Sequence, residues 1–537
     1  MSLARLRGAL GALRSPHVLG ALSALPAALA LAAPAAADPT PVTPSGPVPT
    51  LAAHMGKAAH AQPVRGIRPA PQQPFMAPDP KNNVHNDSWM TDDYPGLSGP
   101  LGRSPDQFST TIGRDCVTLT FDAKGRLVGT CTDLSHGPAL YMFDPRTLDT
   151  LAFLQLPYVP PPAGTNPATN TTGGAYFYLD NQDRAVVATS DRRISVYAET
   201  DTGGQPGFAQ VASYDPTPCL PPDERMPSVL PDSRGRLWFV GRTHGTVGVL
   251  DRSSGRCGSI VLGEEIENSF ASARDGIYIV SDTAQYKFRA GAALQPRAIW
   301  RATYRNTGRQ KVGQFNAGSG TTPTLLWSSK ADERSKVPDY VAITDNADPL
   351  DVIVYRTADR LEHGQRRVVC QIPVFGKGAS ADENSLIAVG QSLIAENNSG
   401  YDLTTWNDQL GDGTQIGGDL NLVSRPGMAR IDIAADGRSC KQAWTNTAVR
   451  PPSAVSKGDS ANGLIYTYEN LRDSSGADPW YWSALSYRTG KVVWRVRAGY
   501  GGLFNNHYAG IALGKAPGGP ATLYLGGIGG IMALRDG

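Results

Sequence analysis

Residues 267–282, ENSFASARDGIYIVSD, align without a gap with residues 383–398, ENSLIAVGQSLIAENN. Both stretches open on Glu-Asn-Ser, pass through a turn and continue into a β-prone run that ends in a polar pair. Self-similarity between segments this far apart is typical of repeat folds. The recurrence of this unit along the chain therefore decides the predicted fold.

The second half of the unit recurs as eight short β-prone segments, each preceded by turn residues. These segments begin at Gly125, Asp183, Gly235, Gly276, Tyr340, Gln391, Gly463 and Ala521. A further strand follows each one, and in most units a tight turn then leads into a fourth strand. Four antiparallel strands per unit, repeated every roughly 40 to 70 residues, predict a β-propeller.

We predict an all-β propeller of eight four-stranded blades, with seven as the alternative if one degenerate unit is a loop. The last unit stops after its third strand, at residues 534–537. Its outermost strand would then come from the N-terminal side, which closes the ring. Two smaller all-β domains are the other structural alternative, although no Pro- and Gly-rich linker interrupts the repeats.

The beginning of the chain differs from the rest. Residues 1–37 predict a signal peptide, because three arginines precede an Ala- and Leu-rich run that ends at a small-residue cleavage site. A membrane anchor is the alternative, but the apolar run is shorter than the ~20 residues that a span needs. Residues 38–80 are rich in Pro and Ala and are predicted to be a disordered leader, and residues 81–537 form the propeller domain. We therefore expect a secreted or cell-envelope protein with no stable membrane anchor.

Charge and cysteine content narrow the partners and the compartment. The chain has 50 Lys and Arg against 48 Asp and Glu, for a net charge of +2, with no block of like charge. No electrostatic footprint for nucleic acid is visible, so nucleic acid is not expected as a partner. We expect a monomer that binds a small molecule. Six cysteines in an exported chain predict disulfides. Cys116 and Cys131, on adjacent strands of one hairpin, are the best-supported pair, and the other connectivities stay open.

Residues 484–494, ALSYRTGKVVW, resemble the blade motif of the quinoprotein-type propellers (PQQ-like repeats). In that motif a tight Thr-Gly turn joins two strands and a Trp, here Trp494, packs between blades. Quinone-dependent dehydrogenases of this shape also carry two adjacent cysteines, which this sequence lacks. PQQ is therefore not expected as a cofactor. A second similarity, based on residue types, is to the lactonase and gluconolactonase propellers, which hold Ca²⁺ in the central channel with Glu, Asn and Asp side chains.

The loops that lead to one face of a propeller are unusually polar here. Glutamates in these loops, Glu267, Glu383 and Glu469, are the candidate metal ligands. The candidate ligand-binding residues are Asn268, Asp282, Asp345, Asn346, Asn384, Asn397, Asn398 and Asn506. Such an oxygen set suits Ca²⁺, which polarises a carbonyl, with His507 or His244 as the general base. His85-Asn86-Asp87, ahead of the first blade, would lie across the channel mouth.

Structural roles compete with each of these assignments. Asp and Asn also favour turns, because their side chains bond nearby backbone. The repeated glutamates would equally suit bonds to amides of a neighbouring blade, and a lone loop histidine is more often a surface residue. The first functional hypothesis is an exported enzyme, a metal-assisted hydrolase or lyase of a small polar substrate. The alternative is a non-catalytic binding or scaffold propeller, and a quinone-dependent dehydrogenase-like protein comes third.

Overall fold

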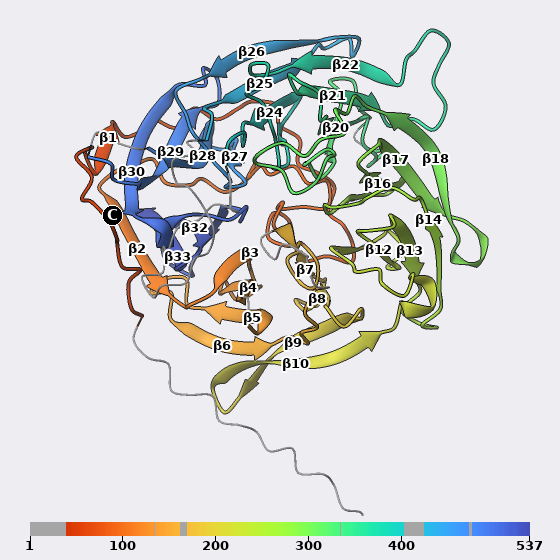
Figure 1. Cartoon of the computed structure of the whole chain (residues 1–537), viewed down its shortest axis with the longest axis horizontal. Helices are drawn as coiled ribbons and strands as arrows, with labels where there is room; N and C mark the ends of the chain where they lie inside the picture. Colours follow the sequence, from red (N-terminus) through yellow and green to blue (C-terminus); the bar gives the residue numbers. More distant parts are fainter. Residues whose placement is uncertain (1–38, 134, 162–168, 333, 402–423, 472–474) are drawn as a thin grey trace, which may run out of the picture. The chain divides into compact units, whose positions relative to one another are not determined.

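The computed structural model describes residues 39–133, 135–161, 169–332, 334–401, 424–471 and 475–537. The predicted signal peptide lies outside these residues and stays a prediction. Across the described residues the strands form eight separate sheets, seven of four strands and one of five, arranged in a ring (Figure 1). The eight-bladed propeller is therefore confirmed over its seven-bladed and two-domain alternatives.

The first seven blades each follow the chain from the innermost strand to the outermost (Figure 1). Blade 1 holds β3 (Asp115–Phe121), β4 (Leu127–Asp133), β5 (Gly137–Phe143) and β6 (Thr150–Gln155); blade 2 holds β7 (Phe177–Leu179), β8 (Ala185–Ala188), β9 (Ile194–Thr202) and β10 (Gln205–Tyr214). Blade 3 holds β11 (Val229–Pro231), β12 (Leu237–Val240), β13 (Thr246–Leu250) and β14 (Cys257–Val261); blade 4 holds β15 (Ala271–Ala273), β16 (Gly276–Val280), β17 (Ala284–Ala290) and β18 (Pro296–Thr303).

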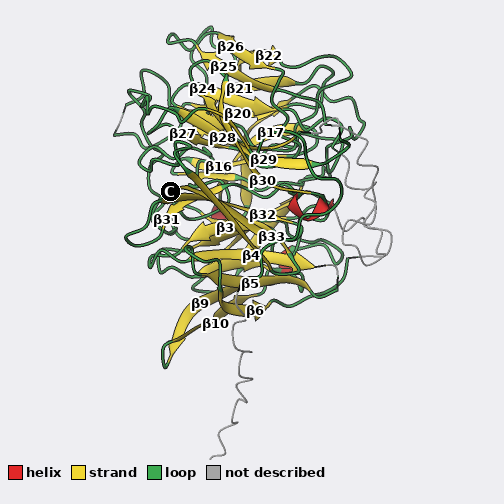
Figure 2. Cartoon of the chain, turned by 90° about the vertical axis from the view of Figure 1, so that its left-hand side faces the viewer, coloured by secondary structure: helices red, strands yellow, loops and turns green. Residues whose placement is uncertain are grey.

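The second half of the ring repeats this order. Blade 5 holds β19 (Thr324–Leu326), β20 (Tyr340–Thr344), β21 (Asp351–Arg356) and β22 (Val368–Pro373); blade 6 holds β23 (Ile387–Val389), β24 (Ser392–Glu396), β25 (Met428–Ile433) and β26 (Cys440–Asn446); blade 7 holds β27 (Lys457–Asp459), β28 (Leu464–Asn470), β29 (Pro479–Ser486) and β30 (Val492–Tyr500). The described helices are single 3₁₀ turns, η2 (Thr217–Cys219), η3 (Ala292–Leu294) and η4 (Gly502–Phe504) (Figure 2). None of the helices in the described ranges has the length and apolarity of a membrane span.

Blade 8 closes the ring with strands from both ends of the domain. Its inner strands are β31 (Ala512–Lys515), β32 (Ala521–Gly527) and β33 (Gly530–Asp536), and its outermost strand is β2 (Pro105–Thr111). β2 pairs with β33 along its whole length, which confirms the predicted closure. β1 (His54–Gly56) adds a fifth strand outside β30 of blade 7.

Trp494, on β30, shows how neighbouring blades pack. Its side chain is fully buried, and a Cβ added at Gly102 would lie 2.7 Å from its ring. Gly102 stands just before β2, so the indole fills the space between blade 7 and the chain that enters blade 8. This is the inter-blade position that the resemblance implied for this tryptophan.

Three disulfides account for all six cysteines. Cys116–Cys131 joins β3 to β4 within blade 1, as predicted. Cys219–Cys257 joins η2 to β14, and Cys370–Cys440 joins the outermost strands of blades 5 and 6. Such pairing is consistent with an oxidising compartment.

The segment ahead of blade 1 is held against the ring, although we expected residues 38–80 to be disordered. Besides the β1 pairing, Val42 N donates to Ser109 Oγ over 3.1 Å in blade 8, and Val64 N donates to Ser460 O over 2.9 Å in blade 7. The low apolar content of the segment pointed to disorder. Backbone hydrogen bonds to the blades, which composition does not report, hold it instead.

Residues 73–94, which we call the channel strap, run along the first strands of seven blades. The contacts, from blade 2 to blade 8, are Leu179 N to Asn82 O, Gln73 Nε2 to Pro231 O, Ser272 N to Ser88 O, Leu325 N to Trp89 O, Ala388 N to Thr91 O, Gly458 N to Asp92 O and Leu513 N to Tyr94 Oη. The innermost strand of a blade has an open edge whose amides need partners. The strap supplies those partners and brings its own polar side chains to the channel side of the blades.

Candidate functional site

The two glutamates that open the repeated unit meet in the structure. Glu267 enters β15 of blade 4 and Glu383 enters β23 of blade 6, and both are buried. The two carboxyl groups lie close enough for each to shift the pKa of the other. Gly320 makes room for this approach, because a Cβ there would lie 2.6 Å from Glu383 Oε2. Two equivalent loops from non-neighbouring blades thus converge on one point.

The pair holds a proton at neutral pH. Burial raises the pKa of Glu267 to about 7, and the positive charge of Arg242 opposes part of that rise. Burial also raises the pKa of Glu383 well above its usual range, and repulsion from Glu267 raises it further. Two buried carboxyls in contact cannot both ionise without a compensating charge, so one stays protonated.

Most of the oxygens of this pair lack a protein donor. Glu267 Oε2 accepts a hydrogen bond of 3.3 Å from Asn268 Nδ2, and the Tyr176 hydroxyl donates to Asn268 Oδ1 over 3.2 Å. No well-formed bond reaches Glu267 Oε1 or either oxygen of Glu383 from the described residues, although the Phe315 amide is close enough to lower the Glu383 pKa. Buried acceptors are rarely left in this state.

Aromatic side chains surround the pair. Burial, together with the charges of both glutamates, raises the pKa of Tyr176 and of Tyr508 well above the usual range, so both hydroxyls stay protonated. The Tyr508 ring packs against Phe315 with centroids 4.7 Å apart and against Tyr401 at 5.5 Å. The carboxyls therefore lie in a low-dielectric setting in which any charge they carry interacts strongly.

The predicted histidines and the third glutamate occupy different settings. His507 lies beside the aromatic cluster, 5.9 Å from the Phe315 ring, and its Nδ1 is 3.0 Å from Asp115 Oδ2. His244 pairs with Asp223 at 2.9 Å, and both side chains are exposed. Glu469 forms an ion pair with Arg495 at 2.7 Å within blade 7. Of the three predicted metal ligands, the structure thus brings two together and gives the third a cationic partner.

The predicted Asp and Asn residues mainly hold loops in place. Asn398 Oδ1 accepts the Glu383 amide over 2.7 Å, and Asn384 Nδ2 donates to Glu396 Oε2 over 3.1 Å, so these two help to position the Glu383 loop. The others bond backbone groups near them in the chain or in adjoining loops; they are Asp282, Asp345, Asn346, Asn397 and Asn506. This matches the turn chemistry weighed above for Asp and Asn.

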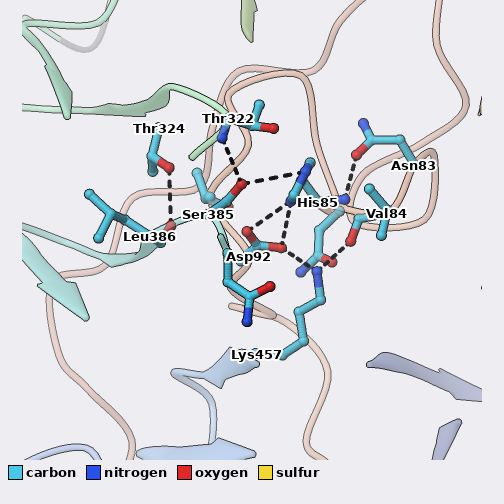
Figure 3. A network of polar contacts seen from close by, with 12 residues as sticks. Asn83, Val84, His85, Asp92, Thr322, Thr324, Ser385, Leu386 and Lys457 are labelled. Atoms are coloured by element: carbon cyan, nitrogen blue, oxygen red, sulfur yellow. Dashed lines mark hydrogen bonds and ion pairs between the residues drawn. The ribbon is translucent and has the colours of Figure 1, made fainter. Parts of the chain in front are cut away.

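A second polar cluster joins the channel strap to blades 6 and 7 (Figure 3). His85 Nδ1 of the strap lies 3.0 Å from Asp92 Oδ2, and Lys457 of β27 contacts the same carboxylate. Sequence analysis placed His85 at the channel but gave no reason to pair it with Asp92, Lys457 or Ser385. Tyr176 links the two clusters, because its ring stacks on His85 with centroids 6.4 Å apart.

One other group of acidic residues in the described ranges has metal-binding dimensions. Ligand atoms of Asp122, Asp183 and Glu199 lie within 4.8 Å of one another. The Arg126 guanidinium pairs with Asp122 at 2.5 Å and also contacts Glu199. An arginine thus already contacts two of these three carboxylates.

Comparisons with known proteins support the fold. No family model matches the chain. It is 27% identical over 286 residues to an uncharacterized protein from Archaeoglobus fulgidus, a match that covers 51% of this chain and 52% of that one, so the chain spans about half of the length of this relative. Among solved structures, it is similar to the quinohemoprotein alcohol dehydrogenase ADHIIG from Pseudomonas putida HK5, with a TM-score of 0.51, 11% identity and coverage of 85% of this chain and 80% of the other. A virginiamycin B lyase from Staphylococcus aureus aligns at a TM-score of only 0.33 and 9% identity, over 80% of this chain and 98% of the other. The likeness to the quinohemoprotein alcohol dehydrogenase agrees with the propeller fold, and it extends no further than the fold.

Proposed function

We propose that this protein is an exported propeller enzyme, a metal-assisted hydrolase or lyase, that binds Ca²⁺ and a small polar substrate at the Glu267–Glu383 pair. One observation carries the proposal. Two buried carboxyls from different blades meet, and three of their four oxygens have no well-formed hydrogen bond from the described residues. Such a site calls for a proton, a cation or a donor-rich ligand.

The donor set fits a hard cation. All of the free atoms are oxygens, and the buried Asn384 Oδ1 beside Glu383 adds a further acceptor without a partner in the described residues. Ca²⁺ takes carboxylate, amide and carbonyl oxygens with flexible geometry. A bound cation would replace the shared proton, so binding is expected to strengthen as the pH rises and to release a proton.

The protein residues prepare this site in defined ways. Asn268 holds one oxygen of Glu267 and orients the Tyr176 hydroxyl. Asn398 fixes the backbone of Glu383. Ca²⁺, when bound, supplies a Lewis acid that polarises a carbonyl of the substrate. Tyr176 and Tyr508 remain neutral hydroxyls whose protons go to Asn268 Oδ1 and Gly313 O, so both oxygens can accept a hydrogen bond from a polar ligand.

Calorimetric titration of the purified full-length chain with Ca²⁺ at pH 8 tests the proposal. We expect one site in the wild type and none in E267Q or E383Q. The matched control is E224Q, because Glu224 is equally buried but its carboxylate is already bonded to Thr243 N, His244 N and Thr246 Oγ1. Absence of binding in the wild type would overturn the metal site.

Turnover separates the enzyme from the binding-propeller alternative. The Ca²⁺-loaded protein is assayed against a panel of small esters, lactones and polyol-containing substrates. Turnover that E383Q loses and E224Q keeps supports the enzyme. Ca²⁺ binding without any turnover on the panel favours a non-catalytic binding role.

A further inference from the structure

The histidine of the channel strap lies between a carboxylate and a hydroxyl (Figure 3). His85 Nδ1 is 3.0 Å and 3.2 Å from the two oxygens of Asp92, and His85 Nε2 is 3.5 Å from Ser385 Oγ. All three side chains are buried. An imidazole held on one side by a carboxylate and facing a hydroxyl on the other is the arrangement that activates a serine nucleophile.

The surrounding contacts keep this geometry in place. Lys457 contacts the Asp92 carboxylate and the Val84 carbonyl, so a buried side chain of blade 7 holds Asp92 from a second side. The Asn83 side chain accepts the His85 amide over 2.6 Å. The Thr322 amide donates to Ser385 Oγ over 3.2 Å, which leaves the serine proton directed elsewhere, with His85 Nε2 as its nearby acceptor. The distance of 3.5 Å between Ser385 Oγ and His85 Nε2 is long for a hydrogen bond. Catalytic hydrogen bonds are often long in the absence of substrate and shorten when substrate binds.

Residues next to Ser385 have buried side-chain atoms that lack a hydrogen-bond partner among the described residues. Thr322, which bonds Ser385 through its amide, has a buried hydroxyl without a partner among the described residues. The two residues that precede Ser385, Glu383 and Asn384, likewise have buried oxygens without one. Glu383 and Ser385 stand two residues apart in the same loop ahead of β23, so we expect a ligand at the Glu267–Glu383 pair to extend toward Ser385 Oγ.

We propose that Ser385 is the nucleophile of an acyl-transfer reaction on a small ester or lactone, with His85 as its general base and Asp92 as a positioning residue. This rests on the proposed function, because the substrate must occupy the same channel site. Ser385 Oγ forms a bond to the acyl carbon, and its proton moves to His85 Nε2. The ester C–O bond then breaks, and His85 returns the proton to the leaving alkoxide. His85 then deprotonates water, whose oxygen bonds to the acyl carbon; the acyl carbon–Oγ bond breaks, and His85 returns the proton to Ser385 Oγ as the carboxylic acid leaves.

Labelling with diisopropyl fluorophosphate tests the nucleophile directly. Ser385 Oγ bonds to phosphorus, fluoride leaves, and His85 takes the serine proton. The full-length protein is treated in EDTA, so that labelling does not depend on the Ca²⁺ site, and the modified peptide is mapped by mass spectrometry. We expect one label, on Ser385, and none in S385A.

The repeat supplies a matched control. Ser269 holds the equivalent position in blade 4, is equally buried, and bonds Ser228 Oγ at 2.8 Å where Ser385 faces a histidine. S269A is therefore expected to label like the wild type. H85A is expected to label at least 100-fold more slowly and to regain part of the rate with added imidazole. A merely structural histidine would show no such rescue.

A spectroscopic signature tests the role of Asp92. An imidazole N–H bonded to a carboxylate gives a low-field proton resonance, expected in the wild type and absent from D92N. Wild-type protein that binds Ca²⁺ but is not labelled at Ser385 would overturn this inference, show that the cluster only anchors the strap, and leave the proposed function standing. Labelling of Ser385 in a protein that does not bind Ca²⁺ would support this inference and overturn the proposed metal site.

Discussion

Glu267 and Glu383 hold the same position in two copies of one repeat, and their carboxyls meet although blade 5 lies between the blades that carry them. A side chain that would serve a local role in a single blade thereby becomes half of a buried pair. The Asn that follows each glutamate also takes part, since Asn268 bonds Glu267 and Asn384 has a buried oxygen with no partner in the described part of the chain. The repeat thus supplies both the frame and the reactive groups of the site.

The raised pKa of Glu267 predicts a pH-dependent stability. Because the folded-state pKa is about 7 and the ordinary value is 4.5, folding favours the protonated form. This contribution is fully present at low pH and is lost as pH rises toward 7, by about 1.4 kcal/mol per pH unit. The glutamine in E267Q mimics the protonated carboxyl and does not ionise, so this variant does not lose that stability as the pH rises. In urea unfolding with EDTA, the stability of E267Q relative to wild type should increase between pH 5 and 7; parallel curves would contradict the assignment.

G320A tests the close approach that the carboxyl pair needs. A Cβ at Gly320 would lie 2.1 Å from the Asp382 carbonyl oxygen as well as against Glu383. Moving that loop should cost about 1–3 kcal/mol and weaken Ca²⁺ binding in the same titration. G376A is the control, because no atom lies within 4 Å of a Cβ there. Equal melting temperatures for the two variants would show that the loop yields without cost.

K457M tests the buried ion pair that ties the strap to blade 7. Lys457 and Asp92 are both fully buried and in contact. Removing the ammonium leaves Asp92 with His85 as its remaining ionisable contact, and breaking a buried pair typically costs about 3–5 kcal/mol. K491M, at an exposed position, should change stability by less than about 0.5 kcal/mol. Denaturant unfolding measures both, and the double variant K457M/D92N should recover part of the loss.

The disulfide between blades 5 and 6 should matter for ring stability. Cys370 and Cys440 are 70 residues apart in the chain and join two outermost strands. Replacing both with alanine lengthens the free loop in the unfolded chain and should cost about 2–4 kcal/mol. Calorimetry of C370A/C440A against wild type checks this. An unchanged melting temperature would mean that blade packing alone holds the two edges together.

Part of the site was predictable because it repeats. The Glu-Asn-Ser openings at 267–269 and 383–385 stand out in an ungapped alignment, so their glutamates could be singled out without a structure. Glu469 had the same residue type but stands within β28 and pairs with Arg495. Residue type alone does not show which glutamate already has a cationic partner.

The sequence by itself determined the blades. Turn residues, β-prone runs and the missing last strand are local signals, because strand formation and tight turns depend on neighbouring residues. The hairpin disulfide Cys116–Cys131 followed from the same local pattern. These features need no knowledge of how one blade faces another.

Only the tertiary structure decided what lies along the channel. The Glu267–Glu383 contact, the path of the channel strap and the approach of His85 to Ser385 all join residues that are far apart in the chain. Ring closure sets these distances, and closure depends on how every blade packs on the next. The strap is ordered there because open strand edges take up its backbone hydrogen bonds. Composition and spacing do not record that interaction.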